Sequence, residues 1–262
     1  MRRWPRPLVV AVDMLNRRGK AVGVRLVRCT GKSPHLIHPK HLVAAPWHDW
    51  YVDRLRQGDV VLDVGCANGA HTVKAAARTR RVVGIDYDVG QLRVARATAR
   101  SLGLDNVLLF AWDLTRPFPF SGETFDVALF LDVIEHLHGR LEVLDEIRRV
   151  LRPDGRLLVS APNRATSWRA RLREAGLFAF SDPDHKIEYT EDEFLAELRA
   201  GGFVPDGPVM PAVYDTPWAG LIDAVGGLSL GLYGRLARWK REVALRRPAE
   251  STGFRLVARR AP

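Results

Sequence analysis

Cysteine is scarce in this sequence, since Cys29 and Cys66 are the only two among 262 residues. Two cysteines cannot build the multiple disulfide bonds that hold small secreted domains together. Long apolar runs are missing too, and no segment reaches the roughly 20 uninterrupted apolar residues of a membrane-spanning helix. The opening segment has the short run LVVAV but no small-residue cleavage site, which argues against a secretory signal. These absences predict a reduced, cytoplasmic protein.

Most of the composition is that of an ordinary folded domain. Hydrophobic residues make up 47% and charged residues 27%, which excludes disordered and fibrous classes as descriptions of the whole chain. The net charge is +10, and its excess lies in the flanks, with 12 basic and 3 acidic residues in 1–57 and 9 and 4 in 210–262. Flanks with such an excess of basic residues suggest a nucleic acid or an anionic membrane as the binding partner. No helix-turn-helix, zinc-finger spacing or RNA-recognition signature accompanies them, so nucleic acid is disfavoured.

Short β-branched segments alternate with segments of helical periodicity from Asp59 onward. The predicted strands are VVLDV, RVVGID, NVLLFAWD, FDVALFLD and RLLVSAPN. This alternation predicts βαβ units that form a parallel sheet with helices on both faces. The sequence RPDG at 152–155 is a turn signal before the fifth strand.

The C-terminal part predicts one further helix and two more strands. Thr190 and Glu193 form a capping-box pattern, and Gly201-Gly202 ends the helix that they begin. Strands are predicted at 203–209 and 253–260. About forty residues separate them, too many for a structureless loop, so this insertion should contain helix.

A glycine-rich turn, DVGCANG at 63–69, joins the first predicted strand to the next helix. Open α/β sheets bind ligands at this position, and glycines allow positive φ angles and close approach of a ligand to the backbone. The spacing matches neither the dinucleotide fingerprint nor a P-loop. The turn therefore predicts a ligand without identifying it.

Acidic residues close two further strands beyond this turn. Asp86 ends the second strand, where a carboxylate can accept hydrogen bonds from ribose hydroxyls. Asp113 ends the third, where it can face an adenine amino group while Trp112 or Leu114 borders the ring. Together these positions favour an adenine nucleoside as ligand.

With these motifs the sequence resembles the class I S-adenosylmethionine-dependent methyltransferases over about residues 48–209. The matching segments, in the family's order, are LDVGCANG at 62–69, VGID at 83–86, WDL at 112–114, FDVA at 125–128 with DVIEHL at 132–137, and LRPDGRL at 151–157. Ala67 stands where the family commonly has glycine, so we expect slightly altered loop geometry. The resemblance implies a Rossmann-like, doubly wound α/β sheet of seven strands, the last one antiparallel. A basic, helical N-terminal extension at 1–57 would precede a methyltransferase domain at 58–262, with a cap inserted at about 210–250.

The resemblance also implies S-adenosylmethionine as the cofactor. The residues expected to bind it lie at the ends of four strands or just after them: Asp63, Gly65, Cys66, Ala67, Gly69, Asp86, Tyr87, Asp113, Leu114 and Asp132. Asp63 and Gly65 would lie beside the methionine moiety, and Gly69 beneath the cofactor. Asp86 would bind the ribose hydroxyls, and Asp113 and Leu114 the adenine. Asp132 would lie near the sulfonium end.

His136 and His185 are the candidate catalytic residues. Methyl transfer needs a base only when the acceptor must lose a proton. His136 follows Glu135 after the fourth strand and could deprotonate a sugar or phenol hydroxyl, or else order its loop. His185 lies in DPDHKIEYT, which resembles a stretch of methyltransferases acting on sugars and other small hydroxylated molecules. It would line the acceptor pocket or pin its loop.

Histidines also gather near the N-terminus, partly within a segment at 38–55 that we expect to form a helix leading into the first strand. The gathered histidines are His35, His38, His41 and His48. Their spacing matches no zinc signature, so no metal site is predicted.

Residues 216–241 combine apolar residues at helical spacing with basic residues and flanking aromatics. This pattern is typical of an interfacial amphipathic helix, in peripheral contact with a membrane. Its five glycines weaken an isolated helix and favour a lid packed over the acceptor pocket. Asp223 argues against a span through the bilayer.

The sequence thus predicts an enzyme that methylates a small molecule, with a hydroxyl of a sugar, glycolipid or related metabolite as the favoured acceptor. A lipid-linked acceptor would suit both the basic flanks and the 216–241 segment. The alternatives left open are an RNA methyltransferase that uses the basic flanks, a nucleotide-dependent oxidoreductase on a similar fold, and a cofactor-binding protein without activity.

Overall fold

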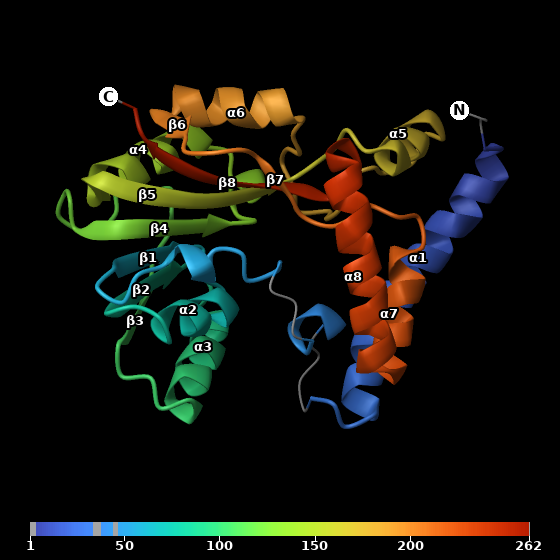
Figure 1. The fold of residues 1–262 in the computed structure, drawn as a ribbon, viewed down its shortest axis with the longest axis horizontal. Coiled ribbons are helices and arrows are strands. Elements are labelled where there is room, and N and C mark those ends of the chain that lie inside the picture. Colours follow the sequence, from blue (N-terminus) through green and yellow to red (C-terminus); the bar gives the residue numbers. More distant parts are fainter. Residues whose placement is uncertain (1–3, 34–37, 44–46, 262) are drawn as a thin grey trace. The chain divides into compact units, whose positions relative to one another are not determined.

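The computed structural model describes residues 4–33, 38–43 and 47–261, with the backbone alone for His41. The chain forms two compact units, and neither is continuous in sequence (Figure 1). The sheet unit contains Asp49–Pro162, Asp182–Met210 and Phe254–Pro262, and the helical unit contains Met1–His48, Asn163–Ser181 and Pro211–Gly253. The division at 57/58 expected from the sequence is contiguous, and it stays a prediction.

The sheet is mixed, with its strands in the order β3-β2-β1-β4-β5-β8-β6 (Figure 1). Its members are β1 (Val60–Val64), β2 (Arg81–Asp86), β3 (Val107–Ala111), β4 (Phe125–Leu131), β5 (Leu151–Pro162), β6 (Phe203–Pro205), β7 (Met210–Pro211) and β8 (Gly253–Arg260). The pairs among β1 to β5 are parallel, and β8 runs antiparallel to β6. This confirms the α/β, doubly wound architecture. The two-residue β7, which pairs with β8 off the main path, is an eighth strand beyond the expected seven.

Helices of the sheet unit cover both faces of the sheet, as predicted. They are α2 (Ala70–Ala76), α3 (Val89–Ser101), α4 (Arg140–Val150) and α6 (Glu191–Ala200). Successive side chains of β1 point to opposite faces of the sheet and so belong to two separate core clusters. Leu62 packs in the cluster that contains the α4 and α6 side chains, whereas Val61 packs with side chains of α2. The capping box of Thr190 and Glu193 is present at the start of α6.

The RPDG segment does not separate two elements, because it lies inside β5. In the pairing of β4 with β5, Phe125 faces Leu151 and Val127 faces Arg156. Two residues along β4 therefore correspond to five along β5. The intervening residues bulge out of the ladder. Gly155 suits this bulge, since a Cβ there would lie 2.9 Å from the carbonyl oxygen of Arg152. The turn signal was real, but strand pairing on both sides of it makes it a bulge.

The helical unit contains α1 (Arg6–Cys29), α5 (Ser167–Glu174), α7 (Ala219–Leu228) and α8 (Leu230–Arg246). Helices α1 and α7 meet through glycines: a Cβ on Gly19 would lie 2.4 Å from the carbonyl oxygen of Gly220, and one on Gly23 would lie 2.3 Å from that of Asp223. Glycine lowers intrinsic helix propensity, and here it permits the close contact of two backbones.

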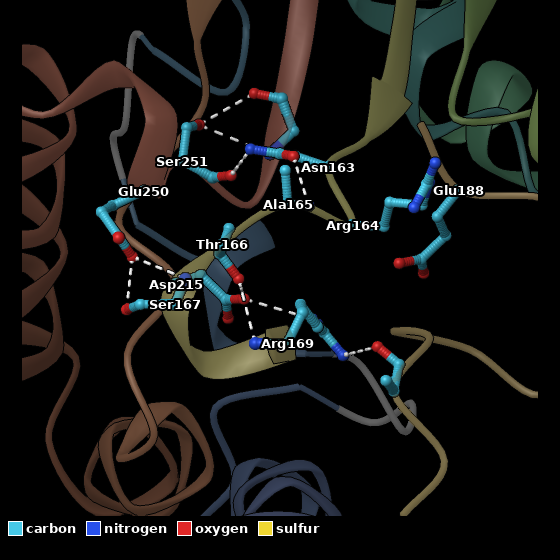
Figure 2. Close-up of polar contacts among 12 residues, drawn as sticks. Asn163, Arg164, Ala165, Thr166, Ser167, Arg169, Glu188, Asp215, Glu250 and Ser251 are labelled. Carbon is cyan, nitrogen blue, oxygen red and sulfur yellow. Dashed lines mark hydrogen bonds and ion pairs between the residues drawn. The ribbon is translucent and has the colours of Figure 1, made fainter. Parts of the chain in front are cut away.

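Buried polar side chains join the non-contiguous segments of the helical unit (Figure 2). Asp215 is 5% exposed and accepts hydrogen bonds from the Thr166 hydroxyl at 2.6 Å and from Nε of Arg169 at 3.1 Å. Glu250 accepts from the hydroxyl and the backbone N–H of Ser167. These contacts hold α5 to the chain around α7 and α8 within this unit.

Two expectations about helices differ from the structure. The described part of 38–55 contains two short 3-10 turns, η1 (Pro39–His41) and η2 (Val52–Arg54), where one helix was expected. The insertion is helical as predicted, but Ser229 has extended φ and ψ angles and divides 216–241 between α7 and α8. No helix in the described ranges is long and apolar enough to cross a membrane.

Candidate functional site

Four parallel strands end beside one another at the edge of the sheet where the predicted ligand site lies. Strand β1 pairs with β2 on one side and with β4 on the other, and β2 pairs with β3. Successive strands are added on one side of β1 up to β3, and then on its other side from β4 onward. Open α/β sheets bind ligands where the strand order changes direction in this way, beyond the carboxyl ends of the strands. The sequence-predicted cofactor residues lie in the last residues of these four strands or just after them.

The turn after β1 has three residues in the left-handed region. Gly65 and Gly69 have φ angles of 74° and 75°, and Ala67 has 43°. A Cβ on Gly65 would lie 2.7 Å from Val133, and one on Gly69 would lie 2.7 Å from Ala95. Ala67 therefore has a left-handed backbone, which costs a residue with a Cβ about 1–2 kcal/mol, and the altered loop geometry expected there stays a prediction. The turn thus keeps a glycine-like path without a glycine at its centre.

Asp63 and Asp86 place two carboxylates beside this turn. Asp63 is 3% exposed and accepts a hydrogen bond of 2.6 Å from the Thr72 hydroxyl. Burial raises its pKa to about 6, the Thr72 hydroxyl opposes the rise, and Asp86 adds to it. Asp86 accepts from the backbone N–H of Ala67 at 2.9 Å and from that of Asp88 at 2.8 Å, one bond to each oxygen. A carboxylate has about four lone-pair sites, so Asp86 keeps acceptor capacity.

The remaining predicted cofactor residues have varied environments. The Asp113 carboxylate is exposed and accepts hydrogen bonds from the N–H and hydroxyl of Thr115, which lower its pKa. Leu114 is half-buried, and Tyr87 is 79% exposed. Cys66 is buried, and burial raises the pKa of its thiol. That thiol therefore packs in the turn as a neutral group.

The residues after β4 form a second group, in which the two predicted histidines meet. Asp132 has a φ angle of 55° and accepts a hydrogen bond from the Ser160 hydroxyl at 2.7 Å. Glu135 and His136 follow on η3 (Ile134–His136), and the imidazole rings of His136 and His185 lie edge to face with centroids 4.6 Å apart. Burial, and then the neighbouring His185, lower the pKa of His136.

Sequence reasoning missed two residues that hold these groups in place. Glu188 is buried, and its carboxylate lies 2.8 Å from Nδ1 of His185. Thr72 holds Asp63 from the first turn of α2. The spacing of three residues between His185 and Glu188 was visible in the sequence, but it had no meaning without the fold.

The N-terminal histidines play no part in this group as far as the structure describes them. Nε2 of His38 lies 3.1 Å from the Asp223 carboxylate within the helical unit. His35 and the side chain of His41 lie outside the described residues. Where the chain is described, Glu135, His136 and His185 form the one set of three side chains close enough to share a metal ion.

Comparison with known proteins identifies the family of the chain. Residues 55–202, more than half of the chain, match the model of a methyltransferase domain family. The chain belongs to the class I S-adenosylmethionine-dependent methyltransferases. Over 221 residues, 79% of each chain, the methyltransferase is 29% identical to 27-O-demethylrifamycin SV methyltransferase of Amycolatopsis mediterranei. It is also 34% identical over 179 residues to a probable S-adenosylmethionine-dependent methyltransferase of Mycolicibacterium smegmatis, covering 62% of this chain and 67% of that one.

Solved structures show the same fold. The [4+2]-cyclase SpnF aligns with a TM-score of 0.60 and 21% identity, covering 81% of this methyltransferase and 79% of that chain. The confirmed family and cofactor overturn the alternative of a nucleotide-dependent oxidoreductase and that of a protein without activity.

The residues of the β1 turn fit S-adenosylmethionine chemically. Asp63 is a buried carboxylate with a raised pKa, so a positive charge beside it, such as the amino group or sulfonium of the cofactor, would be stabilised. Gly65 and Gly69 present backbone without side chains, and Asp86 can accept from hydroxyls. The bound cofactor supplies a methyl group on a positively charged sulfur.

Proposed function

We propose that the methyltransferase transfers this methyl group to a hydroxyl oxygen of a small acceptor, with a sugar, glycolipid or related metabolite as the favoured class. The observation that carries the proposal is the meeting of His136 and His185, with Glu135 and Glu188, after β4. A hydroxyl, unlike an amine, must lose its proton to become a methyl ether, and two imidazoles beside carboxylates are suited to that task. The relative from Amycolatopsis mediterranei is itself named for methylation at an oxygen.

In this proposal the predicted cofactor residues divide the ligand among them. Asp86 binds the ribose hydroxyls from its place beside Ala67, and Asp63 and Gly65 bind the methionine moiety. The other roles follow the family resemblance: Gly69 beneath the cofactor, Asp113 and Leu114 at the adenine, Asp132 near the sulfur, and Cys66, Ala67 and Tyr87 along the same surface. Alignment of the methyl group with the acceptor oxygen supplies much of the rate.

A labelled methyl group tests the proposal. The protein is incubated with S-adenosylmethionine carrying a CD3 group and with hydroxylated acceptors, namely sugars, lipid-linked sugars, phenols and polyketides. We expect mass spectrometry to find the label on an acceptor oxygen, and less label with an Asp86→Ala variant at the same cofactor concentration. Label on nitrogen or carbon, or no transfer to any hydroxylated acceptor by protein that binds the cofactor, would contradict the proposal.

We further propose that the acceptor is carried on a lipid and that residues 216–241 contact the membrane surface. Large apolar side chains of α7, α8 and their flanks are exposed, among them Trp218 at 45%, Leu228 at 64% and Trp239 at 44%. Arg235 and Arg238 of α8 are exposed as well, whereas Arg241 donates to the carbonyl oxygens of Pro211 and Ala212 and is thereby occupied. A lid over the acceptor pocket remains the competing explanation for these features.

A further inference from the structure

Two segments about fifty residues apart bring three ligand-bearing side chains together in the sheet unit. The candidate ligand atoms of Glu135, His136 and His185 all lie within 4.8 Å of one another. Backbone contacts hold the segments in register, because the N–H of Lys186 donates to the carbonyl oxygen of Glu135 at 2.7 Å. The separation of these side chains therefore depends on the fold rather than on flexible loops.

The orientation of His185 is set by a carboxylate behind it. Nδ1 of its ring lies 2.8 Å from Oε1 of the buried Glu188, and Nε2 lies on the side of Glu135, 3.9 Å from Oε1. A carboxylate that holds one ring nitrogen while the other nitrogen faces a ligand is the usual arrangement behind metal-binding histidines, where it fixes the tautomer.

The group contains an excess of negative charge. Glu135 is 2% exposed, and in the described part of the chain its Oε2 has no hydrogen-bond partner. The carboxylates of Asp132, Glu188 and Asp182 are near enough to act on it electrostatically. A buried carboxylate among other carboxylates is costly unless a cation accompanies it.

We propose that Glu135, His136 and His185 form a binding site for one divalent first-row transition-metal ion, with Zn²⁺ or Mn²⁺ as the suitable ions. Two imidazoles and one carboxylate are a recurring set for such ions, and they leave positions open for a further ligand. His136 is exposed, so this open side is accessible. Resting on the proposed function, the ion would bind the acceptor hydroxyl and lower its pKa, so that its proton passes to water. The oxygen would then take the methyl group from sulfur, and the cofactor would leave as S-adenosylhomocysteine. The two histidines would thus promote loss of the proton through the ion that they hold.

The test measures metal binding without any acceptor. Full-length protein, freed of metal with EDTA, is titrated with ZnCl2 and with MnCl2 by calorimetry, and with CoCl2 by visible absorption. We expect one ion per chain, and at least tenfold weaker binding in Glu135→Gln and His185→Gln. Glu188→Gln, which alters only the group behind His185, should weaken binding about 10–100-fold. His138→Gln changes an exposed neighbouring histidine outside the group, and it should bind as the wild type does.

Folding of each variant is checked by its affinity for S-adenosylmethionine. The proposal is overturned if the wild type binds neither Zn²⁺ nor Mn²⁺ at one equivalent, or if the Glu135 and His185 variants bind like the wild type. If the protein methylates a hydroxyl but binds no ion, the metal-site proposal is overturned and the proposed function stands. Protein that binds the ion but methylates nitrogen would overturn the proposed function alone.

Discussion

The Asp86 carboxylate accepts a hydrogen bond of 2.9 Å from the backbone N–H of Ala67. This bond connects the end of β2 to the glycine-rich turn after β1, so one side chain both shapes the turn and keeps capacity to bind a ligand there.

Replacement of Asp86 by alanine should weaken S-adenosylmethionine binding by about 1–3 kcal/mol, because a hydrogen-bonded charged acceptor is lost. Calorimetric titration with S-adenosylmethionine and S-adenosylhomocysteine measures this loss. Asp105→Ala, which removes an exposed carboxylate before β3, is the control and should leave both affinities unchanged. Equal affinities in wild type and Asp86→Ala would disprove the ribose assignment.

Stability should depend on pH through Asp63. Its carboxyl keeps its proton up to about pH 6 when folded but releases it near pH 3.8 when unfolded. The unfolded state therefore loses this proton first, and the free energy of unfolding should fall as pH rises from about 4 to about 6. The total fall is about 3 kcal/mol.

Denaturant unfolding of the cofactor-free protein across this pH range checks the slope. Asp63→Asn should lack this contribution, so its stability relative to wild type should increase from pH 4 to pH 6. Thr72→Val removes a hydrogen bond that lowers the Asp63 pKa, and it should extend the fall above pH 6. Parallel pH profiles for wild type and Asp63→Asn would show that the Asp63 pKa is not raised.

The glycine contact between α1 and α7 should tolerate no side chain at Gly220. A Cβ there would lie 1.8 Å from the carbonyl oxygen of Asn16, and the resulting overpacking should cost about 1–3 kcal/mol of unfolding free energy. Gly234→Ala in α8 is the matched control, because its Cβ would meet nothing closer than 3.9 Å. That change should stabilise the protein by about 0.5–1 kcal/mol. Similar effects of the two substitutions would rule out a close contact at Gly220.

Membrane contact through 216–241 should appear as binding to anionic vesicles. Sedimentation with phosphatidylglycerol vesicles should recover the wild-type protein, and high salt should reduce the recovery because Arg235 and Arg238 contribute electrostatically. Trp218→Ala and Trp239→Ala should each reduce it, since exposed aromatic rings favour the interface. Leu102→Ala, which removes an exposed apolar side chain in the sheet unit, should have no effect. Failure of the wild type to sediment with vesicles would favour the lid.

Local patterns carried much of the fold. The alternation of strand and helix segments determined β1 to β5 and the helices between them, because each face of a buried strand must be covered. The positions of Gly65 and Gly69 followed from the backbone angles that a tight turn requires. The capping box at Thr190 determined where α6 begins, because its two hydrogen bonds lie within one helical turn.

Tertiary structure decided the features that depend on partners distant in sequence. Pairing of β5 with β4 turned RPDG into a bulge, and packing of α1 on α7 made Gly19 and Gly220 favourable in helices. The sequence indicated His136 and His185 separately, but only the fold brought their rings together and placed Glu188 behind His185. The sequence alone determines residue type and local spacing, whereas the pairing of strands and the packing of helices set the distances between side chains that are remote in sequence.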